Sequence, residues 1–171
     1  MKYIWFVIFF IMILSCKTTD RTLTRKSDNY LNDCPEAGNC NFKLLKNKSL
    51  NILTDNLGDL YTKINEGDNL VLVFDYEKNK NLDLQDSGYK EQIFIELNPN
   101  ALEIETHNLK TKKLVFARLC YCKGQTGYYK IKKGNLSIKK VKKRNYHIML
   151  DFKVDEVPQV ISTVNQVFSL K

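Results

Sequence analysis

Apolar and polar residues alternate along several stretches of the 171-residue chain. In Asn69–Tyr76, Gln92–Leu97 and Tyr146–Val154 every second residue is apolar or aromatic. Successive side chains of an extended strand point to opposite faces, so this period of two predicts half-buried β-strands. Shorter stretches that we also predict to be strands are Phe42–Lys46, Ser49–Thr54, Leu102–Thr106, Leu114–Cys122, Tyr128–Lys132 and Asn135–Val141.

Residues typical of turns separate these stretches. The turns are predicted at Glu66–Asp68, Asp86–Gly88, Asn98–Asn100, Lys133–Asn135 and Lys143–Asn145. No helix of useful length is expected between the strands, which argues against a parallel sheet. The prediction is therefore a mainly β fold, an antiparallel β-sandwich or open barrel of eight to nine strands.

The C-terminal segment allows two interpretations. Its apolar residues have helical spacing, but several are β-branched and favour strands, so the segment is either a short helix or a final strand. These residues are Val157, Val160, Ile161, Val164 and Phe168.

The first residues have the pattern of an export signal. Lys2 precedes an apolar run that ends at Leu14, too short for a bilayer span of about 18 residues, and a small residue, Ser15, follows. Ile13–Cys16 resembles a bacterial lipobox, which implies that residues 1–15 are cleaved off and that Cys16 receives lipid. Several acyl chains would anchor the protein firmly in a membrane. The alternative is an ordinary signal peptide that ends near a cysteine.

In well-studied Gram-negative lipoproteins, an Asp after the lipidated cysteine retains the protein in the inner membrane. Lys17 occupies that position here, which favours the outer membrane. Residues 16–33 are mostly polar and are predicted to form a flexible tether, followed by one domain over 34–171. The formal charge is +8, and loss of Lys2 with the signal leaves 8 − 1 = +7.

Four cysteines follow Cys16, and an even number in an exported chain predicts disulfides. On a regular strand, Cys120 and Cys122 would lie at the limit of disulfide reach. We therefore expect them to pair with Cys34 and Cys40 rather than with each other. On the strand Leu114–Cys122, the face with Val115, Ala117 and Leu119 is expected to point to the core. The face with Arg118 and the cysteines is expected to be less dry.

Candidate catalytic chemistry is sparse. His147 is expected to be solvated, and His107 could join Cys120 and Cys122 only in a soft-metal site, for which a disulfide is the favoured alternative. Ser87 has no nucleophile pattern and is interpreted as a turn residue. The carboxylates expected to be solvated rather than an acid–base pair are Glu96, Glu103, Glu105, Asp151, Asp155 and Glu156. We expect no enzyme, cofactor or metal site.

Basic residues gather in one part of the sequence. They are Lys130, Lys132, Lys133, Lys139, Lys140, Lys142, Lys143 and Arg144. One interpretation is a solvated hairpin whose lysines protect a sheet edge. The other is a patch for an anionic partner such as lipid head groups or an acidic glycan. Nucleic acid is not expected, because Lys dominates over Arg and the chain is exported.

Three blocks of sequence are similar to small uncharacterised lipoproteins of Bacteroidota, particularly flavobacteria. They are Asp33–Glu36 with Cys40 and Phe42, Arg118–Lys130, and Gly134–Ile138. The resemblance covers residues 33–168 and implies no known activity or functional residue.

These features predict an outer-membrane lipoprotein whose β-domain binds or scaffolds another envelope component. Two alternatives stay open at this point. One is an envelope redox or metal-binding protein that uses Cys120 and Cys122, and the other is a sandwich that binds an apolar ligand between its sheets.

Overall fold

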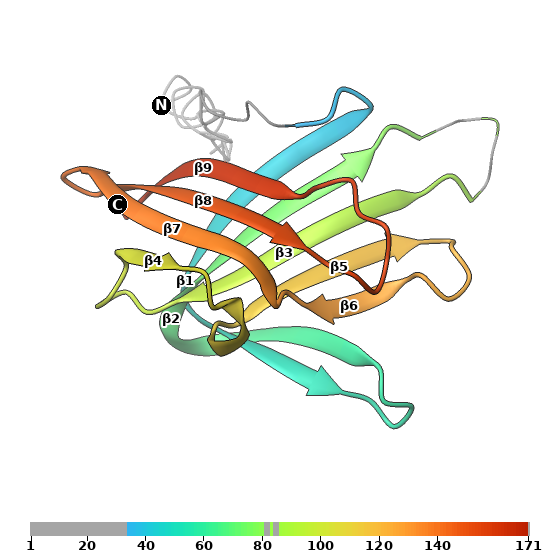
Figure 1. Ribbon diagram of the computed structural model, residues 1–171, viewed down its shortest axis with the longest axis horizontal. Coiled ribbons are helices and arrows are strands. Elements are labelled where there is room, and N and C mark those ends of the chain that lie inside the picture. The colour runs from blue at the N-terminus through green and yellow to red at the C-terminus, as the bar shows by residue number, and fades with distance from the viewer. Residues whose placement is uncertain (1–33, 81–82, 84–85, 171) are drawn as a thin grey trace, which may run out of the picture.

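The computed structural model describes residues 34–80, 83 and 86–170, and the predicted signal peptide and tether, Cys16 included, lie outside these residues. Nine strands and one short 3₁₀ helix, η1 (Leu109–Thr111), make up the domain (Figure 1). The strands are β1 (Gly38–Thr54), β2 (Leu60–Lys78), β3 (Tyr89–Leu97), β4 (Ile104–Thr106), β5 (Leu114–Cys120), β6 (Gly127–Lys130), β7 (Lys133–Lys142), β8 (Asn145–Lys153) and β9 (Thr163–Ser169).

The strands form two antiparallel sheets packed face to face. Sheet A has the order β1-β2-β3-β5-β6, and sheet B has the order β4-β7-β8-β9. Neither sheet closes on itself, and the predicted mainly β, antiparallel sandwich-like fold is confirmed. The C-terminal segment is a strand, β9, which pairs with β8 from Asp151↔Thr163 to Asn145↔Ser169.

The main core lies between the two sheets. Leu72 on β2 and Ile93 on β3 face Ile148 and Leu150 on β8, and all four are fully buried. Phe116 on β5 and Phe152 on β8 meet across the core with ring centroids 5.9 Å apart. Close-packed side chains thus fill the space between the sheets.

The long β1–β2 hairpin bends and forms a third layer. Its ladder is irregular between Lys46 and Lys48, where Asn47 has a positive φ of 55°. Beyond the bend, the hairpin runs back over sheet A (Figure 1), and Leu50 packs against Val71 and Val115 on the outer face of the sheet. Sheet A is therefore covered on both faces.

Three sequence predictions about the strands were wrong. The predicted turns at Glu66–Asp68 and Lys133–Asn135 lie within β2 and β7. At the first, Gly67 allows close approach of the opposite strand, because a Cβ there would lie 2.0 Å from the Ser49 Oγ. On β5, Leu114 and Phe116 face the main core, while Val115 and Ala117 face the outer cluster covered by the hairpin. Both faces of β5 are dry, so the charge of Arg118 was no guide to the solvent side.

Candidate functional site

The most deeply buried ionisable side chain is Glu91 on β3. It is fully buried, and its register partners are Tyr76 on β2 and Arg118 on β5. Its two carboxylate oxygens accept hydrogen bonds from the backbone N–H groups of Val160 and Ile161, each at 2.7 Å. Val160 and Ile161 belong to the segment before β9, so Glu91 connects sheet A to sheet B.

Tyr89 links Glu91 to Arg118. Its hydroxyl donates to Glu91 and accepts from Arg118 Nε at 3.3 Å, and the guanidinium lies 5.2 Å from the centre of its ring. Burial and, second, the hydrogen bond to Glu91 raise the pKa of Tyr89 to about 12. Burial followed by the charge of Glu91 also raises the pKa of Tyr76.

The same cluster organises the turn after β5. One terminal nitrogen of Arg118 donates to the backbone and the side-chain oxygens of Gln125, each at 3.0 Å. Thr126 Oγ1 donates to the Arg118 carbonyl at 3.1 Å. Sequence analysis missed Tyr89 and Glu91, although both are in phase with the apolar residues Ile93 and Ile95.

The four cysteines form two local disulfides, Cys34–Cys40 and Cys120–Cys122, with Cα atoms 5.8 and 5.2 Å apart. The expected pairing between the two segments was wrong. Cys40 is in register with Tyr76, Glu91 and Arg118, which places it three strands from β5. Three strand spacings are about 14 Å, well beyond the Cα separation of about 7 Å that a disulfide allows.

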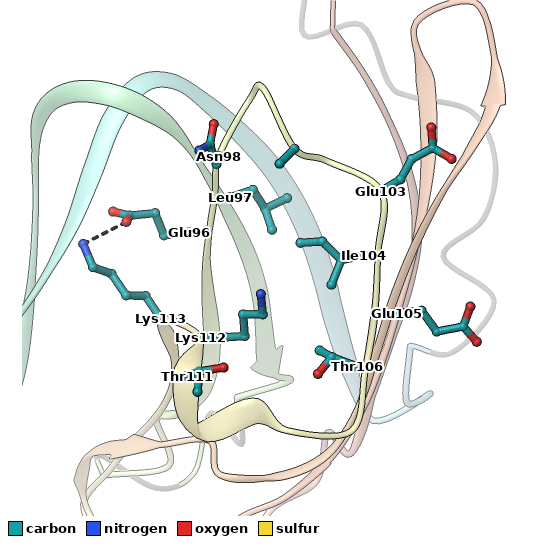
Figure 2. A pocket seen from close by; sticks show the side chains of 11 residues that line it. Glu96, Leu97, Asn98, Glu103, Ile104, Glu105, Thr106, Thr111, Lys112 and Lys113 are labelled. Atoms are coloured by element: carbon teal, nitrogen blue, oxygen red, sulfur yellow. Dashed lines mark ion pairs between the residues drawn. The ribbon is translucent and has the colours of Figure 1, made fainter.

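Residues 96–113 form a loop that surrounds an open hollow of about 780 Å³ (Figure 2). Its neck is closed by the Glu96 N–H donating to the Lys113 carbonyl at 3.0 Å, and by the Lys113 ammonium 2.8 Å from the Glu96 carboxylate. Leu97, Ile104 and the Lys112 ammonium turn toward the hollow. The second oxygen of Glu96 accepts from the Leu50 N–H at 2.6 Å, so this carboxylate is held by structural partners.

The other predicted carboxylates are dispersed. Glu103 and Glu105 border the hollow but point away from its centre (Figure 2). Asp151 on β8 accepts from Thr163 Oγ1 at 2.9 Å and lines a small hollow of about 80 Å³ together with Glu105 and His107. Asp155 and Glu156 follow β8 and pair with lysines.

The histidines are also apart. His107 is exposed and contacts the Asn135 side chain, whereas His147 on β8 is half-buried and its Nε2 lies 2.6 Å from Asn165 Oδ1. The described residues contain no group of three or more metal-ligating side chains. Ser87 is half-buried between the turn residues Asp86 and Gly88.

The basic residues fall into two groups at opposite ends of β7. Lys130, Lys132 and Lys133 lie at the β6–β7 junction, and Lys142 ends β7 nine residues after Lys133, about 30 Å away at about 3.3 Å per residue. At the junction, Lys132 lies 3.4 Å from Glu156, and Lys133 pairs with Asp155. These contacts raise the pKa of Lys133 and lower that of Asp155, mainly through the hydrogen bond between them.

The other group forms the end of the β7–β8 hairpin. Lys139 is 3.5 Å from Glu105, whereas Lys140, Lys142, Lys143 and Arg144 are exposed and have no ion-pair partner among residues 34–80, 83 and 86–170. We call these last four residues the basic hairpin end. β4 pairs with β7 only over Leu136–Ile138, so Lys139–Lys142 also occupy an open sheet edge.

A scan of protein-family models, a search of curated proteins and a search of solved structures each gave no match to this chain. Within the described ranges, no helix has the length and apolar character needed to cross a membrane.

Proposed function

We propose that the protein is a lipid-anchored envelope lipoprotein of the outer membrane, whose β-sandwich binds an anionic lipid surface. The observation that carries this proposal is the basic hairpin end. It places four cations on one exposed turn without neutralising carboxylates. Each Lys or Arg near an anionic membrane contributes about 1 kcal/mol, so four would strengthen binding by about 10³-fold at low ionic strength.

The predicted anchor would bring the domain within reach of such a surface. The lipobox-like Ile13–Cys16 precedes the domain, and residues 16–33 would span about 20–25 Å as a flexible chain. Acyl chains at Cys16 would hold the protein in the membrane, and the basic hairpin end would orient the sandwich on it.

The interior supports a binding role at the surface rather than between the sheets. Phe116, Ile93 and Leu150 fill the core, so an apolar ligand would have to displace packed side chains. Every buried side-chain nitrogen and oxygen in the described ranges has a hydrogen-bond partner. Glu96 is held by the Leu50 N–H and by Lys113, and Asp155 and Glu156 pair with lysines, so these carboxylates make structural contacts.

Vesicle binding tests the basic hairpin end. A chain beginning at Lys17 is sedimented with phosphatidylcholine vesicles with and without phosphatidylglycerol, at low salt. Lys→Glu changes at positions 140, 142 and 143 should weaken binding to the anionic vesicles by more than about 10-fold. The matched control carries Lys→Glu at positions 130, 132 and 133 and has the same net charge.

Equal loss of binding in the two triple variants would show that only net charge matters and would overturn the proposed site. Wild-type binding to an acidic polysaccharide but not to the anionic vesicles would make the partner a glycan and reject the lipid surface.

Metabolic labelling tests the anchor. Cells that express the full chain are grown with radiolabelled palmitate. The wild type should carry the label in the membrane fraction, and Cys16→Ser should lose both the label and the membrane association. Absence of label from the wild type would refute the lipoprotein assignment and leave the vesicle result unaffected.

A further inference from the structure

We infer that the Cys120–Cys122 disulfide is a site of thiol–disulfide exchange that oxidises a dithiol of a second protein. The two cysteines enclose a single residue, Tyr121, whose side chain is 84% exposed. Cys120 ends β5 and Cys122 begins the turn beyond it, and both are partly accessible. An accessible disulfide can be attacked by a thiolate from outside, whereas a buried one cannot.

The fold around this disulfide is held by other interactions. Cys120 pairs with Tyr89 on β3, and the turn that follows is fixed by the Gln125 N–H donating to the Cys122 carbonyl at 3.0 Å. Arg118 holds the same turn through Gln125, and Thr126 holds it through the Arg118 carbonyl. Opening the disulfide therefore leaves β5 and its turn in place, and both sulfurs stay close enough to reform the bond.

Arg118 provides a positive charge beside Cys120. The two residues are on the same face of β5, about 7 Å apart along the strand, and both neighbour Tyr89. The guanidinium donates to the Tyr89 hydroxyl and to the oxygens of Gln125, and Glu91, the register partner of Arg118 on β3, accepts from the same hydroxyl. A nearby cation favours a departing thiolate, so we assign the sulfur of Cys120 as the leaving group.

The exchange proceeds in two steps. A substrate thiolate attacks Cys122 Sγ, the Cys122–Cys120 bond breaks, and a mixed disulfide forms while Cys120 leaves as a thiolate beside Arg118. The second thiolate of the substrate then attacks the substrate sulfur of the mixed disulfide. This attack forms the substrate disulfide and releases Cys122 as a thiolate. The substrate loses two electrons and two protons and gains a disulfide, and Cys120 and Cys122 become a dithiol. A low-molecular-weight disulfide restores the oxidised pair by the reverse exchange.

The second disulfide is the internal control. Cys34 and Cys40 enclose five residues and pack against the main core. The native protein is equilibrated in a series of reduced and oxidised glutathione mixtures, free thiols are alkylated, and each pair is quantified by peptide mass spectrometry. Cys120–Cys122 should be half-reduced at a ratio of reduced to oxidised glutathione at least about 10-fold lower than Cys34–Cys40. Equal resistance of both pairs until the protein unfolds would overturn the inference.

Activity is measured with a synthetic peptide that contains two cysteines, whose oxidation is followed by chromatography. Wild type should oxidise one equivalent in a single turnover, and many with added oxidised glutathione. The variant Cys120→Ser/Cys122→Ser should lose at least about 10-fold of the rate above background, while Cys34→Ser/Cys40→Ser should keep it. If Cys120→Ser/Cys122→Ser retains the rate, the disulfide is structural only. The same conclusion follows if this variant misfolds and the wild type is inactive. The site does not depend on the lipid anchor, so its failure is distinct from failure of the proposed function.

Discussion

Glu91 on β3 reaches across the sandwich to Ile161, whose backbone N–H it binds at 2.7 Å just before β9 begins. This contact joins a strand of sheet A to the segment that leads into sheet B. A fully buried carboxylate in this position is held by three donors, from Val160, Ile161 and Tyr89.

Glu91→Gln should lower the free energy of unfolding by about 2–4 kcal/mol, because the amide offers only one acceptor oxygen and turns its NH₂ group toward backbone donors. Urea denaturation measures the change. Glu105→Gln is the control: the Glu105 side chain is 70% exposed, and the change should cost less than about 0.5 kcal/mol. A similar loss in both variants would contradict the structural role of Glu91.

Stability should fall in alkali because of Tyr89. The pKa of this half-buried phenol is about 12, against an unperturbed value of 10.0, so between these values the folded state keeps a proton that the unfolded state has lost. Because the unfolded state then binds fewer protons, this contribution is complete below about pH 10 and is lost as the pH rises toward 12. Since Tyr89 is only partly buried, we expect a loss of about 1–2 kcal/mol.

The measurement is urea denaturation of the wild type and Tyr89→Phe at several pH values from 8 to 11.5. Lysines also titrate in this range, so the difference between the two proteins isolates Tyr89. A pH profile unchanged by the substitution would show that another group is responsible.

The folded-back hairpin predicts unequal effects of the same substitution at two leucines. Leu50 is fully buried against sheet A, and Leu57 at the hairpin tip is 87% exposed. Leu50→Ala should destabilise the domain by about 2–4 kcal/mol through lost burial and a cavity, and Leu57→Ala should change it by less than about 0.5 kcal/mol. Thermal and chemical denaturation would detect the difference, and equal effects would mean that the hairpin does not pack on the sheet.

Gly134 near the start of β7 should not tolerate a side chain. Its φ is 134°, and a Cβ would lie 1.9 Å from the Asp151 carbonyl oxygen on β8. Gly134→Ala should destabilise the domain by about 3 kcal/mol or prevent folding. Gly88 has an ordinary φ and nothing within 4 Å of a Cβ, so Gly88→Ala should fold like the wild type by circular dichroism. Normal stability of Gly134→Ala would refute this close contact.

The hydrophobic pattern alone predicted the class of fold and most of the strands. The alternation of Leu70, Leu72, Phe74 and Tyr76 correctly gave the face that points to the main core. It did not show that Val71 and Val73 are also buried. These two valines are covered by the part of the hairpin beyond the bend, which includes Leu50. A period of two predicts a strand with one buried face. Burial of the second face of β2 depends on the bend at Asn47, which folds the hairpin back over the sheet.

The candidate sites were less predictable. The disulfide pairing depends on the order of strands in sheet A, which places β2 and β3 between Cys40 and Cys120 and which no local spacing reveals. Likewise, the eight clustered cations of the sequence became two groups because β7 is extended. Glu91 could have been found as a carboxylate in phase with Ile93 and Ile95, but its partners come from residues about 70 positions later.

The third layer gives the domain two unlike sides. One side of the molecule is the polar outer face of sheet B. The other side is the hairpin, which covers the apolar outer face of sheet A. Removal of residues 48–66 would expose Val71, Phe94 and Val115 together and make the domain prone to self-association. Peptide insertions are best placed at the solvent-exposed tip around Leu57, where they would leave the packing of the hairpin on sheet A in place.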